Sequence, residues 1–407
     1  LEPGSKEIEQ EDSMPPNVLF IITDNQSPWT LGCYGNREIR TPSVDRLAAE
    51  GTRFTESFGV SAVCSPGRAT HLTGLMPSRH GVHNWLGTEK PDVQMGPGAY
   101  CTIREFANLP EVLAGAGYDC GLSGKWHLGD SLHPQLGFRY WFTKPRGATR
   151  AFHDDEAIWQ GEVYQEPRYM LDAITEHAVE FLRQPRQQPF FLYVGYNGPY
   201  GLDQEMRQGH QNRHTAYYAD KPLTCFPRTE THPWLYNNRD CMGNEVTIRS
   251  YAAAVSGVDD GVGTLLDTLD QLGLAEDTLV LYTADHGLCG GHHGVWGMGD
   301  HSRPFHLWQE NLRIPLLFRH PGRIPAGRAI ERMTCNYDLF PSLLDYLGLE
   351  EALPRNYPLP GRSYAPALRG EASDAGEEIL FHEYENVRVV QTREWKLIRR
   401  HPEGPDE

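Results

Sequence analysis

The chain has 407 residues, enough for one large α/β domain or for a large domain and a small one. A hydrophobic content of 39% and a charged content of 22% exclude a disordered or fibrous chain, and no apolar run approaches the roughly 20 residues of a membrane helix. The formal net charge of −17 argues against nucleic acid as a partner, so an anionic ligand requires positive charge concentrated at its site.

Residues 1–13 are polar and acidic, and they lack the basic region and apolar core of a secretory signal. Either a signal has been removed, or the native start is Met14, which directly precedes the first predicted strand. We favour the second and treat residues 1–13 as a flexible leader of a bacterial protein of the cytoplasm or periplasm. The eight cysteines form no C-x-x-C pair, which excludes a zinc ribbon, and most are expected to be buried thiols.

Strand and helix patterns alternate along most of the chain. Residues 17–23 form a continuous apolar run with β-branched side chains, which is typical of a buried parallel strand. Thr41, Pro42 and Gly51 mark the two ends of a helix between them. Further helices are predicted at about residues 64–74, 105–115, 246–272 and 337–347, and further strands at 118–123, 190–196, 278–283 and 314–318. This alternation predicts an α/β sandwich of three layers with a mostly parallel central sheet.

The pattern changes after about residue 375. Residues 378–382, 387–391 and 395–399 resemble short strands of a small antiparallel meander. We therefore predict a main α/β domain at residues 14–375 and a small C-terminal antiparallel subdomain at residues 376–407.

Polar residues follow two of the best predicted strands. Asp24 and Asn25 come after the first, and Asp285 and His286 after the strand at 278–283. Ligands of open α/β sheets bind at the carboxyl ends of the strands, where these side chains would meet. Two carboxylates, an amide oxygen and an imidazole suit one Ca²⁺ or Mg²⁺ ion per chain. The alternative for either pair alone is that the side chains cap turns.

The segment Cys64-Ser65-Pro66-Gly67-Arg68 opens a predicted helix. A proline here is typical of a helix N-terminus, where the unsatisfied amides favour an anion. Arg68 lies one turn after Cys64 on the same face. The alternative is a buried structural cysteine beside a helix.

This C-x-P-x-R pattern, followed by Leu-Thr-Gly and Arg-His-Gly, resembles the signature of the type I sulfatases. The resemblance implies that a maturation enzyme converts Cys64 to formylglycine, which also faces the metal. The hydrated aldehyde attacks sulfur with one hydroxyl, and its second hydroxyl expels sulfate. A plain thiol or alcohol would instead remain as a stable ester.

Three later segments extend the resemblance. The G-K-W-H-L-G stretch at 124–129 is similar to a sulfatase motif in which Lys125 would bind sulfate and His127 would contact the nucleophile as a base. Asp285-His286-Gly287 matches the second metal motif, and residues 290–296 resemble a loop of the same family. The resemblance covers about residues 17–347 and implies the fold of the alkaline-phosphatase superfamily. Relatives continue with a further C-terminal segment, so the resemblance favours an incomplete C-terminus.

The chain departs from the family at two positions that bear on charge. Asn25 stands where a second aspartate is usual, which predicts weaker metal binding. Met298 follows Trp-Gly where a sulfate-binding lysine is usual, and His301 or Arg303 is the candidate substitute.

A third departure concerns the leaving group. Tyr200 stands where many relatives have histidine, and its higher intrinsic pKa makes it a weaker acid, so His301, His293 or another histidine would take that role. The loop after the Cys64 helix offers candidate sugar contacts, for which ordinary loop packing is an equal alternative. These candidates are Arg79, His80, His83, Asn84 and Trp85.

The favoured function is hydrolysis of a sulfate ester on a carbohydrate. The first alternative keeps the same residues and changes the substrate to a phosphonate monoester or phosphodiester. The second is a non-catalytic binder of sulfated glycans. The presence of Cys64, Arg68, Lys125, His127 and Asp285 argues against this alternative.

Overall fold

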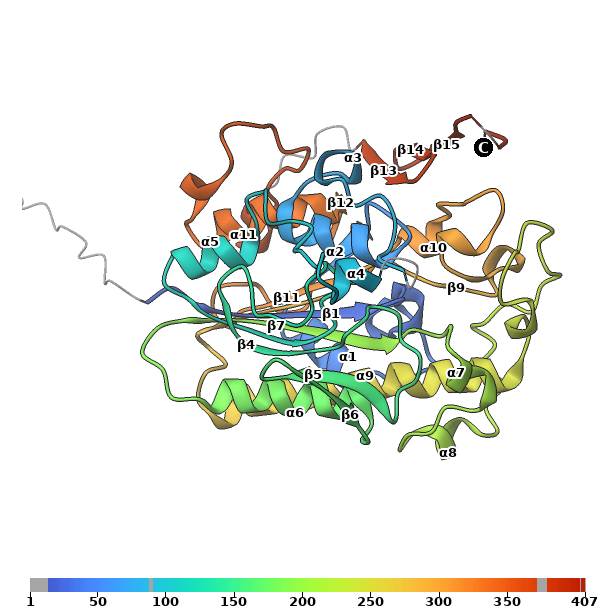
Figure 1. The fold of residues 1–407 in the computed structure, drawn as a ribbon, viewed down its shortest axis with the longest axis horizontal. Helices are drawn as coiled ribbons and strands as arrows, with labels where there is room; N and C mark the ends of the chain where they lie inside the picture. The colour runs from blue at the N-terminus through green and yellow to red at the C-terminus, as the bar shows by residue number, and fades with distance from the viewer. Residues whose placement is uncertain (1–13, 88–90, 372–378, 403, 407) are drawn as a thin grey trace, which may run out of the picture.

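Ten strands form one mixed sheet through the middle of the molecule (Figure 1). The structure is a computed structural model, and it describes residues 14–87, 91–371, 379–402 and 404–406. In spatial order the strands are β12 (Arg328–Cys335), β2 (Thr52–Phe58), β11 (Leu316–Arg319), β8 (Thr278–Ala284), β1 (Asn17–Asp24), β7 (Phe190–Pro199), β3 (Asp119–Gly124), β4 (Phe138–Thr143), β5 (Asp155–Trp159) and β6 (Glu162–Glu166). Of the ten described strands, β11 and β5 run opposite to the other eight. The predicted mostly parallel sheet is confirmed.

Helices cover both faces of this sheet (Figure 1). Along β1, Val18, Phe20 and Ile22 pack on one face, and Leu19 and Ile21 pack on the other. The first face is covered by α2 (Cys64–Thr73), α5 (Leu109–Gly115) and α11 (Leu339–Tyr346), and the second by α1 (Pro42–Ala49), α6 (Met170–Arg183) and α9 (Glu245–Gln271). A strand that is apolar on both sides is therefore buried between two helical layers, as predicted for a three-layer sandwich.

Two predicted helices differ at their starts. The helix expected from residue 105 begins at Leu109, because the Asn108 side chain caps it by accepting the backbone N–H of Glu111 at 3.0 Å. The helix expected from residue 337 opens with a 3₁₀ turn, Asn336–Asp338. Strands β2, β4 to β6 and β12, and helix α6, were not predicted.

The C-terminal meander is confirmed as a separate antiparallel sheet of β13 (Leu380–Tyr384), β14 (Val387–Gln391) and β15 (Lys396–Arg400). Its inner face, with Leu380, Val389 and Ile398, packs in the same apolar cluster as Cys64 and so supports the start of α2. Residue 378 of the first predicted strand and the predicted leader at 1–13 lie outside the described residues.

The remaining short elements belong to the connecting loops. They are α3 (Pro77–His80), α4 (Pro91–Gln94), α7 (Gln204–Gln208), α8 (Thr215–Tyr218), α10 (Gln309–Leu312), α12 (Ala365–Leu368) and the pair β9 (Cys289–Gly290) and β10 (Trp296–Gly297). All eight cysteines are free thiols, and six are buried, as predicted. Within the described ranges, no helix is both long and apolar enough to cross a membrane.

Candidate active site

The carboxyl ends of β1 and β8 meet at one edge of the sheet. Asp24 ends β1, and Asp285 and His286 follow β8, its parallel neighbour. The backbone N–H of Asn25 donates to Asp285 Oδ1 at 3.3 Å, which links the two strand ends. The predicted convergence of these four residues is confirmed.

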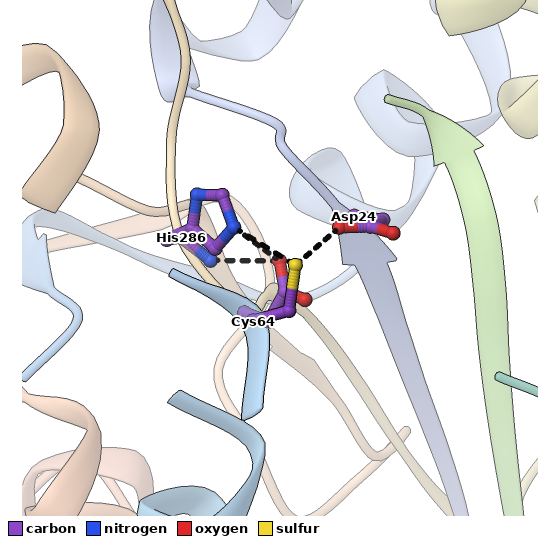
Figure 2. A group of neighbouring side chains, drawn as sticks. Asp24, Cys64 and His286 are labelled. Atoms are coloured by element: carbon purple, nitrogen blue, oxygen red, sulfur yellow. Dashed lines mark hydrogen bonds and ion pairs between the residues drawn. The ribbon is translucent and has the colours of Figure 1, made fainter. Parts of the chain in front are cut away.

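Cys64 is the first residue of α2 and points at this strand edge. Its Sγ lies 3.4 Å from Asp24 Oδ1 and 3.3 Å from His286 Nε2 (Figure 2). Together with Asp285, these side chains place one ligand atom each within 4.8 Å of one another. The close approach of α2 depends on Gly67, because a methyl group there would collide with the Asp285 carbonyl oxygen.

The donor set fits a divalent cation. Asn25 has a left-handed backbone (φ 60°) and donates its Nδ2 to the Tyr200 carbonyl at 2.8 Å. Its Oδ1 is buried and accepts no hydrogen bond within the described part of the chain, which is costly for an oxygen that has no ligand. His286 Nδ1 donates to the Gly287 carbonyl at 2.8 Å, so His286 Nε2 keeps its lone pair on the side of Cys64. With the two carboxylates, these atoms make an oxygen-rich donor set of the kind that Ca²⁺ and Mg²⁺ prefer.

Two buried cations balance the two carboxylates. Arg68 Nε lies 3.0 Å from Asp285 Oδ2, and Lys125 Nζ lies 2.5 Å from Asp24 Oδ2. Arg68 Nη1 also donates to the Lys125 carbonyl at 2.9 Å, while Arg68 Nη2 is a buried donor without a partner among the described residues. An unpartnered guanidinium N–H beside a fully buried ion pair is a ready donor for an anion.

Burial controls the protonation of this cluster. Burial and the neighbouring Asp24 raise the pKa of the Cys64 thiol well above its usual range, so the unmodified side chain is neutral. Burial and Asp285 raise the pKa of Asp24. Burial also acts to raise the pKa of Asp285, but the Arg68 guanidinium holds the pKa of Asp285 below its usual range.

His127 offers a lone pair to the site. Its Nε2 lies 3.1 Å from the Leu86 carbonyl, and since a carbonyl only accepts, Nε2 carries the hydrogen. His127 Nδ1 is buried and unpartnered in the residues described, and burial together with Lys125 lowers the pKa of this histidine well below its usual range. The ring is held against Gly147, where a methyl group would collide with it.

A pocket of about 170 Å³ opens onto Cys64. Its lining is Cys64, Trp85, His127, Ala148, Tyr200, Leu202, Asn238, Met298, Asp300 and His301. Sequence reasoning singled out six of these and missed Ala148, Leu202, Asn238 and Asp300, which belong to no motif. Asp300 adjoins His301 in the chain, and this adjacency was the one signal that could have pointed to it.

The other predicted substrate contacts are placed differently. Tyr200 lines the pocket, and burial raises the pKa of its hydroxyl well above the usual range. His83 is exposed, and Arg303 lies over the rings of Tyr236 and Phe305. Among the described residues, neither His83 nor Arg303 belongs to the pocket lining.

Comparisons with known proteins agree with this geometry. The family model described as Sulfatase matches residues 16–349. The chain is 31% identical to the steryl-sulfatase of Rattus norvegicus, covering 90% of the chain and 72% of that protein. It is 27% identical to the N-acetylglucosamine-6-O-sulfatase of Bacteroides thetaiotaomicron, covering 96% and 79%.

Solved structures show the same fold. A protein solved with its substrate, D-glucosamine-2-N,6-O-disulfate, superposes with a TM-score of 0.73 at 23% identity, covering 97% of this chain and 90% of that one. The phosphonate monoester hydrolase of Agrobacterium radiobacter superposes with a TM-score of 0.68 at 21% identity, covering 95% and 87%.

Proposed function

The chain belongs to the sulfatase family and is a sulfuric ester hydrolase, and we propose that it removes sulfate from a carbohydrate by means of a formylglycine made from Cys64. The observation that supports this most is the gathering of Cys64 with Asp24, Asp285 and His286 within 4.8 Å beside the pocket. A maturation enzyme that oxidises Cys64 is part of the proposal.

One Ca²⁺ or Mg²⁺ ion would be held by Asp24, Asn25, Asp285, His286 and the modified residue 64. Asp24 and Asp285 are already balanced by Lys125 and Arg68, so a divalent cation would give the cluster a local charge of about +2 that an anion could neutralise. When bound, the cation supplies electrostatic stabilisation of the sulfate oxygens.

The chain's own residues would then have separate roles in binding and proton transfer. Lys125 and the unpartnered Arg68 Nη2 would donate to sulfate oxygens, and His127 Nδ1 would accept the proton of the attacking hydroxyl. When formed, the aldehyde hydrate supplies a nucleophilic hydroxyl with its own route for releasing sulfate. The high pKa of Tyr200 favours a binding role for its hydroxyl over proton donation.

A carbohydrate is the proposed leaving group. The relative from Bacteroides thetaiotaomicron carries the name of a sugar sulfatase, and the lining of the pocket includes an aromatic ring, Trp85, and a polar amide, Asn238. His301 lines the pocket and is proposed to contact the substrate there. His83 and Arg303 are proposed to contact parts of the substrate that lie beyond the lining.

The runner-up is a phosphonate monoester or phosphodiester hydrolase. Met298, which replaces the expected sulfate-binding lysine, and the shared fold of the Agrobacterium enzyme favour it. A binder of sulfated glycans without turnover is the third candidate.

The test uses protein produced with a formylglycine-generating enzyme and supplied with Ca²⁺. Peptide mass spectrometry across Cys64 measures the conversion, and sulfate release is assayed with sulfated saccharides and an aryl sulfate, beside an aryl phosphonate. We expect sulfate release that Cys64→Ala abolishes. Faster cleavage of the phosphonate would move the assignment to the runner-up, and glycan binding without release by converted protein would favour the third candidate.

A further inference from the structure

The ring of His301 is held by two donors at the same nitrogen. The backbone N–H of Met298 donates to His301 Nδ1 at 3.2 Å. The Nδ2 of Asn238 lies 3.2 Å from the same Nδ1. Arg207 donates to Asn238 Oδ1, which fixes the amide with its Nδ2 toward the histidine.

These contacts determine where the ring hydrogen lies. A nitrogen that accepts an N–H cannot carry a hydrogen, so His301 Nδ1 is the acceptor and Nε2 is the N–H donor. His301 Nε2 lies 3.7 Å from Asp300 Oδ1, which is buried and has no hydrogen-bond partner among the residues described. His301 lines the pocket that Cys64 also lines, so its Nε2–H is a donor carried by a residue of that lining.

The surrounding loops are shaped to bring these groups together. An isolated bridge pairs Leu235 with Ser302, and the His301 carbonyl accepts the N–H of Tyr236 at 2.8 Å. Asn238 follows with a left-handed backbone (φ 63°), a conformation that asparagine adopts more readily than most residues. At Gly297, a methyl group would collide with His301 Nδ1.

We propose that Asn238 is a positioning residue that holds His301 in its Nε2–H form, as a neutral hydrogen-bond donor to an oxygen of the bound sulfate ester. This role rests on the proposed function. His127 has the opposite arrangement, because its Nε2–H donates to the Leu86 carbonyl and its Nδ1 has no partner among the residues that the structure describes. One side of the pocket would therefore accept a proton while the other donates a hydrogen bond.

The charges around His301 agree with a neutral ring. Burial lowers the pKa of His301, and His286, Arg207 and Arg303 act in the same direction, whereas Asp300 opposes them. Two N–H groups at Nδ1 leave no acceptor for a second ring hydrogen. His301 therefore supplies a hydrogen bond where the lysine expected at Met298 would supply a charge.

The direct test is the nitrogen NMR spectrum of the full chain labelled with ¹⁵N-histidine, with His301→Gln used to assign the His301 signals. We expect an unprotonated Nδ1 and a protonated Nε2. Asn238→Asp places an acceptor at Nδ1 and should move the hydrogen there, whereas Arg207 and Met298 remain in place. A protonated Nδ1 in the unsubstituted protein, or an unchanged tautomer in Asn238→Asp, would overturn the proposal.

Kinetics test the role toward substrate. His301→Gln keeps a neutral donor near the Nε2 position and should retain kcat within about tenfold, whereas His301→Phe removes the donor and should lower kcat by about 10²- to 10³-fold. Equal losses in the two variants, with thermal unfolding unchanged, would refute the donor role. If no sulfate ester is turned over but the expected tautomer is found, the proposed function fails and the positioning by Asn238 stands.

Discussion

The floor and the wall of the pocket have opposite chemistry. We define the floor as Cys64, which lines the pocket, together with the buried charged residues grouped around it, Asp24, Arg68, Lys125 and Asp285. We define the wall as Tyr200, Asn238, Met298, Asp300 and His301. The four charged groups of the floor are fully buried and balance one another, and they come from strand ends, one helix and the loop after β3. The wall comes from loops and, of its described side chains, only Asp300 is a carboxylate and none is a lysine or arginine.

This difference separates two tasks. Charges that are buried, paired and set on rigid elements are suited to holding a metal and an anion in fixed positions. A mostly neutral wall of loop residues cannot hold a sulfate by charge, but it can choose among leaving groups by shape and hydrogen bonds. We therefore expect stability and anion binding to depend mainly on the floor, and substrate choice to depend on the wall.

The largest effect should come from removing one charge of the floor. Arg68→Met leaves Asp285 buried without its ion pair, and breaking a buried pair in this way costs about 3–5 kcal/mol. Urea unfolding of the metal-free protein measures the loss in free energy of unfolding. Met298→Leu in the wall is the matched control and should cost less than about 1.5 kcal/mol.

Addition of Ca²⁺ should affect the stability of the two variants differently. A cation at the strand ends would compensate the unpaired Asp285, so Ca²⁺ should restore part of the stability lost in Arg68→Met. It should stabilise Met298→Leu only as much as the unsubstituted protein. Equal losses in the two variants, in the absence of metal, would show that the floor is not held by its ion pairs.

The floor was predictable from sequence and much of the wall was not. Asp24 and Asp285 follow strongly apolar strands, and Cys64 and Arg68 share a helix turn, so local patterns place them. Asn238 reaches the pocket because its loop pairs with the loop around His301, which is distant in the sequence, and no local pattern encodes such a contact.

The fold shows the same division. Strand β1 is apolar on both faces and was predicted, whereas β2 (TRFTESF) mixes charged and apolar residues and depends on its neighbours in the sheet. Helix α6 was missed although it was predictable, since Leu171, Ile174, Ala178 and Phe181 recur at helical spacing.

The next largest effect concerns acid and His306, whose backbone N–H donates to the carbonyl of Gly299, between Met298 and Asp300 of the wall. His306 is fully buried, its Nε2 lies 2.8 Å from Asn311 Oδ1, and burial lowers the pKa of His306 from 6.5 to about 3. Between these values the unfolded chain binds a proton that the folded protein does not, so stability falls as the pH falls below 6.5. The His306 contribution to this loss is roughly 2 kcal/mol by about pH 5.

His306→Gln tests this assignment because it keeps a donor for Asn311 and removes the titrating group. The free energy of unfolding should then decrease less steeply between about pH 6.5 and about pH 5 than in the unsubstituted protein. Identical slopes in the two proteins would mean that His306 does not cause this loss of stability in acid.

The smallest effect, and the most direct test of the neutral wall, is the addition of a charge. Met298→Lys places an ammonium in the pocket lining to which Cys64 also belongs, at the position where the family resemblance leads us to expect a lysine. A charge-assisted bond from it should tighten inhibition by inorganic sulfate by about five- to tenfold, which corresponds to about 1 to 1.4 kcal/mol. The inhibition constant of sulfate measures this change, with Met298→Leu as the uncharged control.

Asp300 affects how much Met298→Lys tightens the binding of sulfate. Its carboxylate shares the lining with residue 298, and pairing with a new lysine would consume part of the gain. Met298→Lys combined with Asp300→Asn should therefore bind sulfate more tightly than Met298→Lys alone. If neither variant binds sulfate more tightly than Met298→Leu, the wall does not face the anion, and anion recognition belongs to Arg68, Lys125 and the cation that we propose for the strand ends.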